Sequence, residues 1–533
     1  MIKGEINRII SETIGNLQTK EVFPAFDIPP VVIDCPAEKT HGDYATNISL
    51  HIARIIKGKP IEAAEKIVSE IKAQNLRLFK EIEVKEPGFI NFFISPAYLQ
   101  NQIKEILSQK EKFGSSKFGQ GKKVNVEFIS ANPTGPLTLG NGRGGFCGDV
   151  LSNVLEKAGF DVTREYYIND RGEQIKKLGH SVIGDEQAVY KGKYIEDLAK
   201  KVKDKDPEKA GEKAAKIILE DYIKPTIEEK MGIKFDVWFS EKKLYDKGMV
   251  DKTIEEIKKN GFTYESEGAL WFKSKSLGDD KDRVLIRKDG NKTYFASDIA
   301  YLKDKFERGF GKIVIFLGAD HHGYINRLRA ATQAMSFDKD SIKTIIMQLV
   351  AVWSGEEGDK KLLKMSKREG TAIDLDDLIK ELNIDTVRFF FLMRAPNTHL
   401  GFDMDLAREQ SSKNPVYYVQ YAHARINSLL KKAELNAKGK NLELLNHSSE
   451  LQLIKHLVKF PEVVEDTAGD FQVQRLAQYA AELADCFHKF YEDCRVIDED
   501  KNISEARLSL ALAARIVLKN TLDIMGISAP EKM

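Results

Sequence analysis

A loop rich in glycine and small polar side chains, residues 130–145, lies between a predicted strand and a predicted helix. Val124 and Val126 alternate with polar residues before the loop, as in a strand, and apolar residues recur at helical spacing after it. Backbone N–H groups at the start of a helix, together with the helix dipole, favour a bound phosphate. Thr138 and Asn141 also have side chains that can donate hydrogen bonds to phosphate oxygens. The alternative is a glycine-rich turn that merely connects two elements, and the loop alone leaves both interpretations open.

A second loop, residues 364–370, carries Lys364 and Lys367 three positions apart and ends at a glycine. Two such lysines can converge on a pyrophosphate and bring positive charge to the oxygens where negative charge accumulates. The alternative is a solvated basic loop, which is the favoured interpretation for an isolated lysine-rich segment. The position of this loop, after an α/β region and before a helical region, favours the phosphate site.

The elements around the two loops predict a nucleotide-binding α/β fold. A strand, the glycine loop, a helix and a strand at 162–168 form the opening half of such a fold. A second unit contains a buried strand at 313–317, a loop at 318–323 and a helix after it. A Lys/Glu-rich helical stretch at 193–234, followed by mixed structure to about residue 290, indicates an insertion between two halves of one sheet.

Different patterns flank this region. The first residues, from Ile2 to Leu17, predict an amphipathic helix, residues 89–94 predict a strand, and Ser95-Pro96 predicts the start of another helix. From Asn414-Pro415 onward the chain predicts a helical bundle, with helices at 451–464, 473–491 and 505–524. The predicted fold class is therefore multidomain α/β: a Rossmann-like parallel-sheet catalytic domain with an insertion, an N-terminal α+β domain and a C-terminal all-α helical bundle. The predicted domains are 1–112, 113–408 with the helical insertion at about 175–290, and 409–533.

Composition excludes several classes of protein. Lys and Arg (82) nearly balance Asp and Glu (81), so the chain lacks the basic excess of a protein that coats nucleic acid through charge alone. The four cysteines are scattered and form no C-x-x-C pair, which argues against a disulfide framework and a cysteine-based zinc site. His321 and His322 are adjacent but lack a nearby third ligand, so no zinc is expected. Neither a signal peptide nor an apolar run of about 18 residues is present, which predicts a cytoplasmic protein without a membrane span.

The two loops, in this order, resemble the two sequence motifs of class I aminoacyl-tRNA synthetases. Residues 138–141, Thr-Leu-Gly-Asn, stand where that class usually has His-x-Gly-His, and residues 364–367 match its Lys-Met-Ser-Lys motif. The flanking sequence is similar to arginyl-tRNA synthetases across essentially the whole chain. The segments that carry this similarity are 127–136, 166–172, 278–285, 293–301, 318–324 and 417–422.

The resemblance implies an arginine–tRNA ligase that forms arginyl-adenylate from arginine and ATP, with Mg²⁺, and transfers the arginyl group to the terminal ribose of tRNA(Arg). It also implies that activation requires bound tRNA, that no editing domain is needed, and that the enzyme is a monomer. The N-terminal unit resembles a domain that touches the tRNA elbow, and the C-terminal bundle resembles an anticodon-binding domain. Tyr417, Tyr418 and Tyr421 of that bundle have rings that can stack on unpaired bases, although tyrosines at helical spacing are more often core residues.

The resemblance also implies roles for individual residues. The implied catalytic residues are Thr138, Gly140, Asn141, Lys364 and Lys367. The implied ATP-binding residues are Pro133, Thr138, Gly140, Asn141, Arg143, Gly318, Asp320, Lys364, Met365, Ser366 and Lys367. The implied arginine-binding residues are Glu127, Ser130, Asn132 and His321 at the α-amino and carboxylate ends, and Tyr294 and Asp298 at the guanidinium. A carboxylate suits the planar fork of donors on a guanidinium, and an aromatic face or hydroxyl helps to orient it.

One departure from the class pattern affects the expected chemistry. Thr138 and Asn141 replace both histidines of the first motif, and neither side chain carries a positive charge. More of the stabilisation of the β- and γ-phosphates is then expected from Lys364, Lys367 and Arg143. Two alternatives remain: another adenylyl-transferring enzyme of the same fold with a small acceptor, and a relative that binds tRNA but has lost catalysis.

Overall fold

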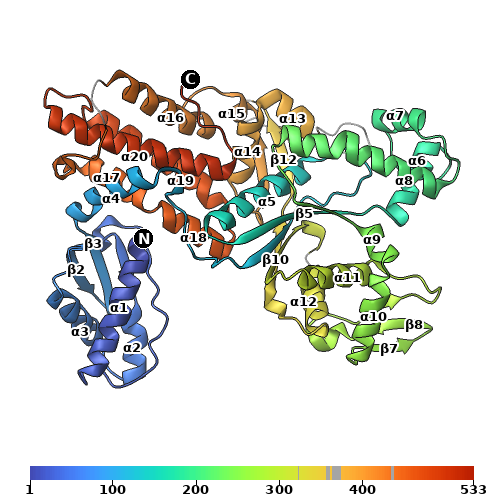
Figure 1. The fold of residues 1–533 in the computed structure, drawn as a ribbon, viewed down its shortest axis with the longest axis horizontal. Coiled ribbons are helices and arrows are strands. Elements are labelled where there is room, and N and C mark those ends of the chain that lie inside the picture. Colours follow the sequence, from blue (N-terminus) through green and yellow to red (C-terminus); the bar gives the residue numbers. More distant parts are fainter. Residues whose placement is uncertain (322, 356–360, 363–373, 434–436) are drawn as a thin grey trace.

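The middle of the chain forms a five-stranded parallel sheet in the order β11-β10-β4-β5-β6, which confirms the predicted Rossmann-like core (Figure 1). Its strands are β4 (Lys123–Glu127), β5 (Asp161–Ile168), β6 (Val237–Ser240), β10 (Lys312–Gly318) and β11 (Ile342–Met347). The computed structural model describes residues 1–321, 323–355, 361–362, 374–433 and 437–533. Successive strands lie to one side of β4 as far as β6, and then β10 returns to its other side. The order therefore reverses between β4 and β10, and ligands of such sheets bind outside the carboxyl ends of the strands at this point.

Three helices connect or support these strands. Helix α5 (Leu139–Lys157) joins β4 to β5, α11 (Tyr294–Glu307) precedes β10, and α12 (Tyr324–Ala334) joins β10 to β11. The strands at β4, β5 and β10 and the helices α5 and α12 agree with the sequence predictions to within a few residues. Strands β6 and β11 were not predicted from the sequence, because short apolar runs without a loop motif resemble any buried segment.

The insertion supplies the right-hand part of the molecule in Figure 1. Its helical part comprises α6 (Glu173–Ile183), α7 (Lys193–Lys201) and α8 (Pro207–Ile218), followed by π-helical turns at Leu219–Ile223 and Thr226–Lys230. After β6 come α9 (Glu241–Asp246), α10 (Met249–Lys259) and an antiparallel sheet of β7 (Thr263–Ser266), β8 (Ala269–Phe272) and β9 (Arg283–Ile286). One strand of the insertion, β6, thus completes the edge of the parallel sheet beside β5.

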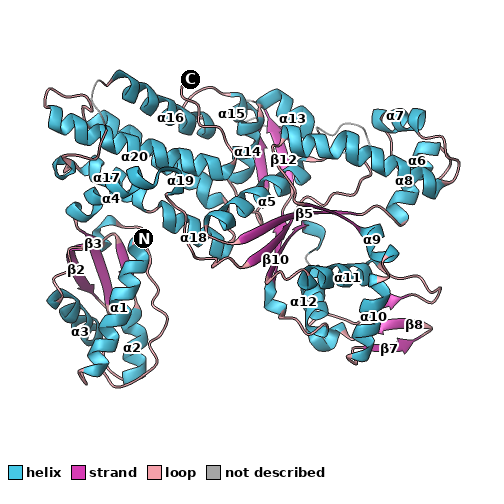
Figure 2. Ribbon diagram, in the orientation of Figure 1, coloured by secondary structure: helices cyan, strands magenta, loops and turns pink. Residues whose placement is uncertain are grey.

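The N-terminal unit contains an antiparallel sheet in the order β1-β3-β2, with helices packed against it (Figure 2). Its elements are α1 (Ile2–Thr19), β1 (Tyr44–Thr46), α2 (Ile48–Ile56), α3 (Pro60–Ala73), β2 (Phe79–Lys85) and β3 (Phe89–Ile94). As predicted, Ser95 caps the next helix, α4 (Pro96–Gln109), and its hydroxyl accepts a hydrogen bond from the Tyr98 N–H at 3.4 Å. Helix α4 leaves this unit and packs against the C-terminal helices.

The C-terminal bundle consists of α16 (Pro415–Lys432), α17 (Ser448–Val458), α18 (Phe460–Asp470), α19 (Gln474–Asp493) and α20 (Lys501–Met525). The prediction of one helix over 451–464 is wrong, because two helices, α17 and α18, meet at Lys459. Pro461 lies in the first turn of α18, where its missing N–H costs nothing, whereas within a continuous helix it would break the backbone hydrogen bonding.

A small sheet and three short helices connect the catalytic core to the bundle. They are β12 (Val350–Ser354), β13 (Lys361–Leu362), β14 (Leu400–Asp403), α13 (Leu375–Leu382), α14 (Ile384–Leu392) and α15 (Met404–Arg408). Helices α14, α18 and α20 all pack against α5. Helix α5 is therefore enclosed by the sheet on one side and by C-terminal elements on the other. Within the described ranges, no helix has the length and apolar content needed to cross a membrane.

The contact of α5 with the sheet depends on Gly148. A Cβ atom at this position would lie 2.3 Å from Cγ of Phe128, a fully buried ring that also packs on Phe235 at a centroid distance of 4.5 Å. Gly148→Ala is expected to lower the free energy of unfolding by about 1–3 kcal/mol, because overpacking forces the helix away from the sheet.

Denaturant unfolding of the two variants Gly148→Ala and Gly15→Ala measures this effect. Gly15 lies in α1, and a Cβ atom added to it would have no neighbour within 4 Å. The same substitution there is therefore expected to leave stability unchanged or raise it by about 0.5–1 kcal/mol. Equal stabilities of the two variants would contradict the tight contact at Gly148.

Candidate active site

A cavity of about 770 Å³ opens at the carboxyl ends of β4, β10 and β11, where the strand order reverses. Segments from the first turn of α5, from the end of β10 and from the β11–β12 connection form its walls. The lining residues are Ile129, Thr138, Leu139, Gly140, Asn141, Gly144, Phe316, Leu317, Gly318, Ala319, Asp320, Met347, Gln348, Leu349 and Val350. Thr138, Gly140, Asn141, Gly318 and Asp320, which were predicted to bind ATP, are thus brought together, while Pro133 is buried outside this lining.

Thr138 and Asn141 form a reciprocal cap at the start of α5. The Asn141 Oδ1 accepts hydrogen bonds from the Thr138 N–H at 3.0 Å and from its hydroxyl at 2.7 Å, and the Asn141 N–H donates to the Thr138 Oγ1 at 3.3 Å. This arrangement fixes the amide of Asn141 with its oxygen turned inward. Its Nδ2 has no hydrogen-bond partner among the described residues, so both of its N–H donors are available to a ligand in the cavity.

Arg143, which was predicted to bind ATP, does not line the cavity in this structure. The side chain is fully buried. Its guanidinium donates to the carbonyls of Gln348 and Thr398 and to that of Ala395, each at 2.9 Å. Arg143 therefore holds the start of α5 against the β11–β12 connection and the 395–398 turn, behind the cavity wall.

The predicted residues Lys364, Met365, Ser366 and Lys367 lie outside the described residues. The described chain resumes at Asp374, beside the glycine loop. The Leu375 N–H donates to the Leu137 carbonyl at 3.3 Å, and a Cβ atom on Gly142 would lie 2.6 Å from the Leu375 side chain. The start of α13 is thus fixed against the first turn of α5.

The backbone turns sharply after β4, next to the cavity. Ile129 and Ser130 have φ values of 64° and 38°, a region that side chains other than glycine rarely adopt. Strain of this kind clusters at functional sites, where surrounding contacts hold it in place. Here the Ser130 hydroxyl donates to Glu127 Oε1 at 3.2 Å and accepts from the Tyr167 N–H at 3.1 Å. The turn therefore presents Glu127 and Ser130 together at the edge of the sheet.

Glu127 forms an ion pair with a fully buried lysine. Lys305 on α11 donates from Nζ to Glu127 Oε2 at 2.5 Å and lies 3.8 Å from Glu165 Oε1. Glu165 on β5 also receives two hydrogen bonds from Arg308, at 2.6 and 2.9 Å. Burial opposes ionisation of Glu165, but the charges of Lys305 and Arg308 and their hydrogen bonds lower its pKa below the ordinary value.

Asp298, one turn after Tyr294 on α11, accepts a hydrogen bond from the Tyr324 hydroxyl of α12. Burial, together with the negative charges of Glu241 and Glu127, raises the pKa of Asp298 to about 7, although the Tyr324 hydrogen bond and the charge of Arg327 act in the opposite direction. Tyr294 is 45% exposed and starts the helix. Asn132 and His321 are exposed as well.

Sequence reasoning missed Glu241, which is only 2% exposed. It begins α9, directly after β6, so it lies at the same carboxyl edge of the sheet as Glu127. Burial raises its pKa, while a hydrogen bond from Ser297 and the charge of Arg171 oppose that rise. A carboxylate immediately after a strand was the available signal, but β6 itself had not been recognised.

The charges of the three carboxylates all act on one hydroxyl group, that of Tyr167. Burial and then the charges of Glu241, Asp298 and Glu127 raise the pKa of the Tyr167 hydroxyl far above its ordinary value. Such a group of carboxylates, two of them with raised pKa values, suits a ligand that carries positive charge at two ends, and we call Glu127, Glu241 and Asp298 together the anionic pocket. Ile129, which lines the cavity, lies two residues after Glu127, so one member of this group is close in sequence to the cavity wall.

Comparisons with known proteins agree with this geometry. Three family models match: Arginyl tRNA synthetase N terminal domain over residues 4–94, tRNA synthetases class I (R), catalytic domain over 102–183 and 184–389, and DALR anticodon binding domain over 419–533. Arginine–tRNA ligase of Shouchella clausii is 43% identical over 539 residues, which cover 96% of each chain. Arginine–tRNA ligase 1 of Halalkalibacterium halodurans is 44% identical over 532 residues, which cover 95% of each chain.

A solved structure shows the same fold. The arginyl-tRNA synthetase of Plasmodium falciparum matches with a TM-score of 0.79 at 18% identity and covers 100% of this chain and 99% of that one. The family models and the identity over nearly the full length together establish the relationship. The chain belongs to the arginyl-tRNA synthetase family and is an arginine–tRNA ligase.

Proposed function

We propose that ATP binds in the cavity at the start of α5 and that arginine binds in the anionic pocket beside it. The observation that carries this proposal is the convergence of Glu127, Glu241 and Asp298 next to a helix N-terminus. The α-ammonium and guanidinium of arginine provide the two positive ends that such a pocket suits. The helix N-terminus suits the phosphates of ATP.

In the first step, a carboxylate oxygen of arginine attacks the α-phosphorus of ATP. A new O–P bond forms as the bond from the α-phosphorus to the bridging oxygen breaks, and pyrophosphate leaves. No protein nucleophile or proton transfer is required, so catalysis consists of alignment and charge stabilisation. In the second step, the hydroxyl oxygen of the terminal ribose of tRNA attacks the arginyl carbonyl carbon. The bond from that carbon to the phosphate oxygen breaks, AMP leaves, and the hydroxyl proton passes to a phosphate oxygen of the departing AMP.

The contacts of the first motif define what Thr138 and Asn141 contribute. Asn141 Nδ2 offers uncharged donors to the phosphates, and the backbone N–H groups of the first turn of α5 offer more. Positive charge must come from elsewhere, and we assign it to Lys364 and Lys367 and to Mg²⁺ bound with ATP. The attachment of Leu375 to Leu137 supports this assignment, because it brings the chain that follows the lysines to the same turn. Mg²⁺ usually keeps several water ligands and binds through substrate phosphates, so it needs no dedicated protein site.

The bundle supports a role in holding tRNA. Tyr417 and Tyr421 of α16 are half-buried and stacked at a centroid distance of 6.3 Å, and the Arg425 guanidinium lies 5.0 Å from the Tyr421 ring. Partly exposed aromatic rings beside an arginine suit unpaired bases. All parts of both pockets come from one chain, so we propose that the monomer is the active unit.

Aminoacylation of total tRNA tests the proposal, with each of the twenty amino acids supplied in labelled form. We expect charging with arginine alone. Charging with another amino acid would overturn the assignment of the anionic pocket. Binding of tRNA without any charging would favour a relative that has lost catalysis.

The raised pKa of Asp298 predicts a pH dependence of arginine binding. Only the ionised carboxylate pairs with a guanidinium, so the KM for arginine is expected to be about 10-fold higher at pH 6 than at pH 8. ATP–pyrophosphate exchange at both values, in the presence of tRNA, measures this change. The folded state also binds this proton more tightly than the unfolded chain, so ionisation of Asp298 destabilises the arginine-free protein as the pH rises from about 4 to about 7.

Two substitutions on α11 distinguish a direct effect of the Asp298 carboxylate on arginine binding from a general effect of removing a carboxylate from this helix. Asp298→Asn is expected to raise the KM for arginine at least 100-fold and to abolish its rise between pH 8 and pH 6. Asp304→Asn removes a carboxylate that pairs with Arg308 at 2.8 Å, and it should leave the pH dependence in place. A KM that does not change with pH in the parent protein would contradict the assignment of Asp298.

Two substitutions of Asn141 distinguish its role in capping α5 from the role of its Nδ2 as a hydrogen-bond donor to ATP. Asn141→Asp keeps an oxygen that accepts from Thr138 but replaces the Nδ2 donors with negative charge. We expect kcat/KM for ATP to fall about 100- to 1000-fold with thermal stability nearly unchanged. Asn141→Ala should lose both ATP use and about 1 kcal/mol of stability. Parent-level exchange by Asn141→Asp would show that Nδ2 does not contact ATP.

A further inference from the structure

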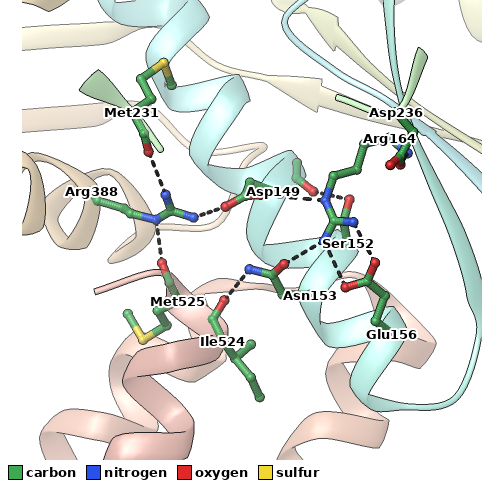
Figure 3. Close-up of polar contacts among 11 residues, drawn as sticks. Asp149, Ser152, Asn153, Glu156, Arg164, Met231, Asp236, Arg388, Ile524 and Met525 are labelled. Atoms are coloured by element: carbon green, nitrogen blue, oxygen red, sulfur yellow. Dashed lines mark hydrogen bonds and ion pairs between the residues drawn. The ribbon is translucent and has the colours of Figure 1, made fainter. Parts of the chain in front are cut away.

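A buried guanidinium joins three separate parts of the chain (Figure 3). Arg388 of α14 is 2% exposed, and it donates from Nη2 to Asp149 of α5. Its Nε donates to the Met525 carbonyl at the end of α20, at 2.5 Å, and its Nη1 donates to the Met231 carbonyl of the insertion, at 3.2 Å. One side chain therefore connects the catalytic helix α5, the insertion and the last helix of the bundle.

A second contact links α5 and α20 directly. Asn153, one turn after Asp149 on α5, donates from Nδ2 to the Ile524 carbonyl of α20 at 2.9 Å, and its Oδ1 accepts from Arg164 of β5 at 2.7 Å (Figure 3). Asp149 and Asn153 thus lie on one face of α5. Through them, the final carbonyls of α20 are attached to the helix whose first turn forms the cavity.

At this junction, the end of α20 packs too closely on Arg388 for the two to move independently. Gly526 ends α20 with a φ of 65°, and a Cβ atom there would lie 2.5 Å from Cζ of Arg388. Asp149 is 7% exposed, and a buried ion that loses its partner is strongly destabilised. A shift of the end of α20 must therefore be followed by Arg388, and through Asp149 by α5.

The two helices reach from the junction to the two functional regions. Helix α20 has 25 residues and packs along α16 and α19 of the bundle. In the other direction, Asn141 lies eight residues before Asp149, which is about 12 Å along a rigid helix. Helix α14 also follows α13, which starts against the glycine loop. The junction thus lies between the helices that carry the aromatic rings assigned to tRNA and the turn assigned to ATP.

We propose that Arg388, Asp149 and Asn153 are positioning residues that set the first turn of α5 according to the position of α20. Binding of tRNA to the bundle then adjusts the donors of Thr138 and Asn141 and raises the rate of arginine activation. This inference rests on the proposed function of the cavity and the bundle, and it assigns to named residues the connection between them.

Substitution of Asn153 and of a matched asparagine tests the proposal. Asn153→Ala removes a hydrogen bond from α5 to α20. Asn520→Ala also removes hydrogen bonds between α20 and an earlier part of the chain, because Asn520 donates to the carbonyls of Lys110 and Phe113 at 2.9 and 3.2 Å, but these bonds do not involve α5. For each variant we would measure the melting temperature, the Kd for tRNA without ATP or arginine, and kcat of ATP–pyrophosphate exchange with and without tRNA.

We expect Asn153→Ala to reduce the stimulation of exchange by tRNA about 10-fold, within the usual range of coupling between sites, and to leave the Kd for tRNA within 2-fold. Asp149→Asn, which keeps the shape of the side chain, should have the same effect or a larger one. Asn520→Ala should keep the stimulation within 2-fold of the parent value. If Asn153 has a purely structural role, the melting temperature of both the Asn153 and the Asn520 variants falls, and tRNA stimulates ATP–pyrophosphate exchange equally in the two variants.

Three results would overturn the proposal. The first is equal stimulation in the Asn153 and Asn520 variants, and the second is a loss of activity that parallels a loss of tRNA binding. The third is exchange by the parent protein that is equally fast without tRNA, since no coupling then exists for these residues to carry. None of these results affects the ligase assignment, which fails only if the parent protein does not charge tRNA with arginine.

Discussion

The site depends on a balance of buried charge at the carboxyl edge of the parallel sheet. Glu127 and Glu165 form ion pairs there with Lys305 and Arg308. Glu241 and Asp298 lack an equally close cation among the described residues, and their pKa values are raised. The fold therefore satisfies part of its own buried charge and leaves the remainder for a cationic ligand. If arginine is that ligand, as proposed, its binding is linked to the ionisation of Glu241 and Asp298.

Helix α5 connects this pocket to the rest of the molecule. Its first turn contributes to the cavity, its middle packs on the sheet through Gly148, and its outer face contacts α14, α18 and α20. The polar contacts of Asp149 with Arg388 and of Asn153 with the end of α20 join this helix to the bundle, and the proposed coupling depends on them.

Local patterns in the sequence predicted most of the fold and part of the site. The alternation before residue 130, the glycine loop and the cap at Ser95 depend on neighbours only a few residues away, and these predictions are confirmed. The buried position of Arg143 could not be predicted, because its acceptors, such as the Gln348 carbonyl, lie more than 200 residues further along the chain. Glu241 was not predicted as a site residue because the strand that places it at the edge of the sheet, β6, had not been predicted. The roles of Lys364 and Lys367 remain predictions that rest on sequence.

The reciprocal cap of Thr138 and Asn141 constrains how this motif can evolve. Each side chain completes a hydrogen bond of the other, so replacing one of them by the histidine usual in the class removes part of a cap that the other needs. Replacing only one of the two residues by histidine gives a protein that has neither the intact cap nor both histidines. The contribution of each of the two positions to the cap therefore depends on the residue at the other one.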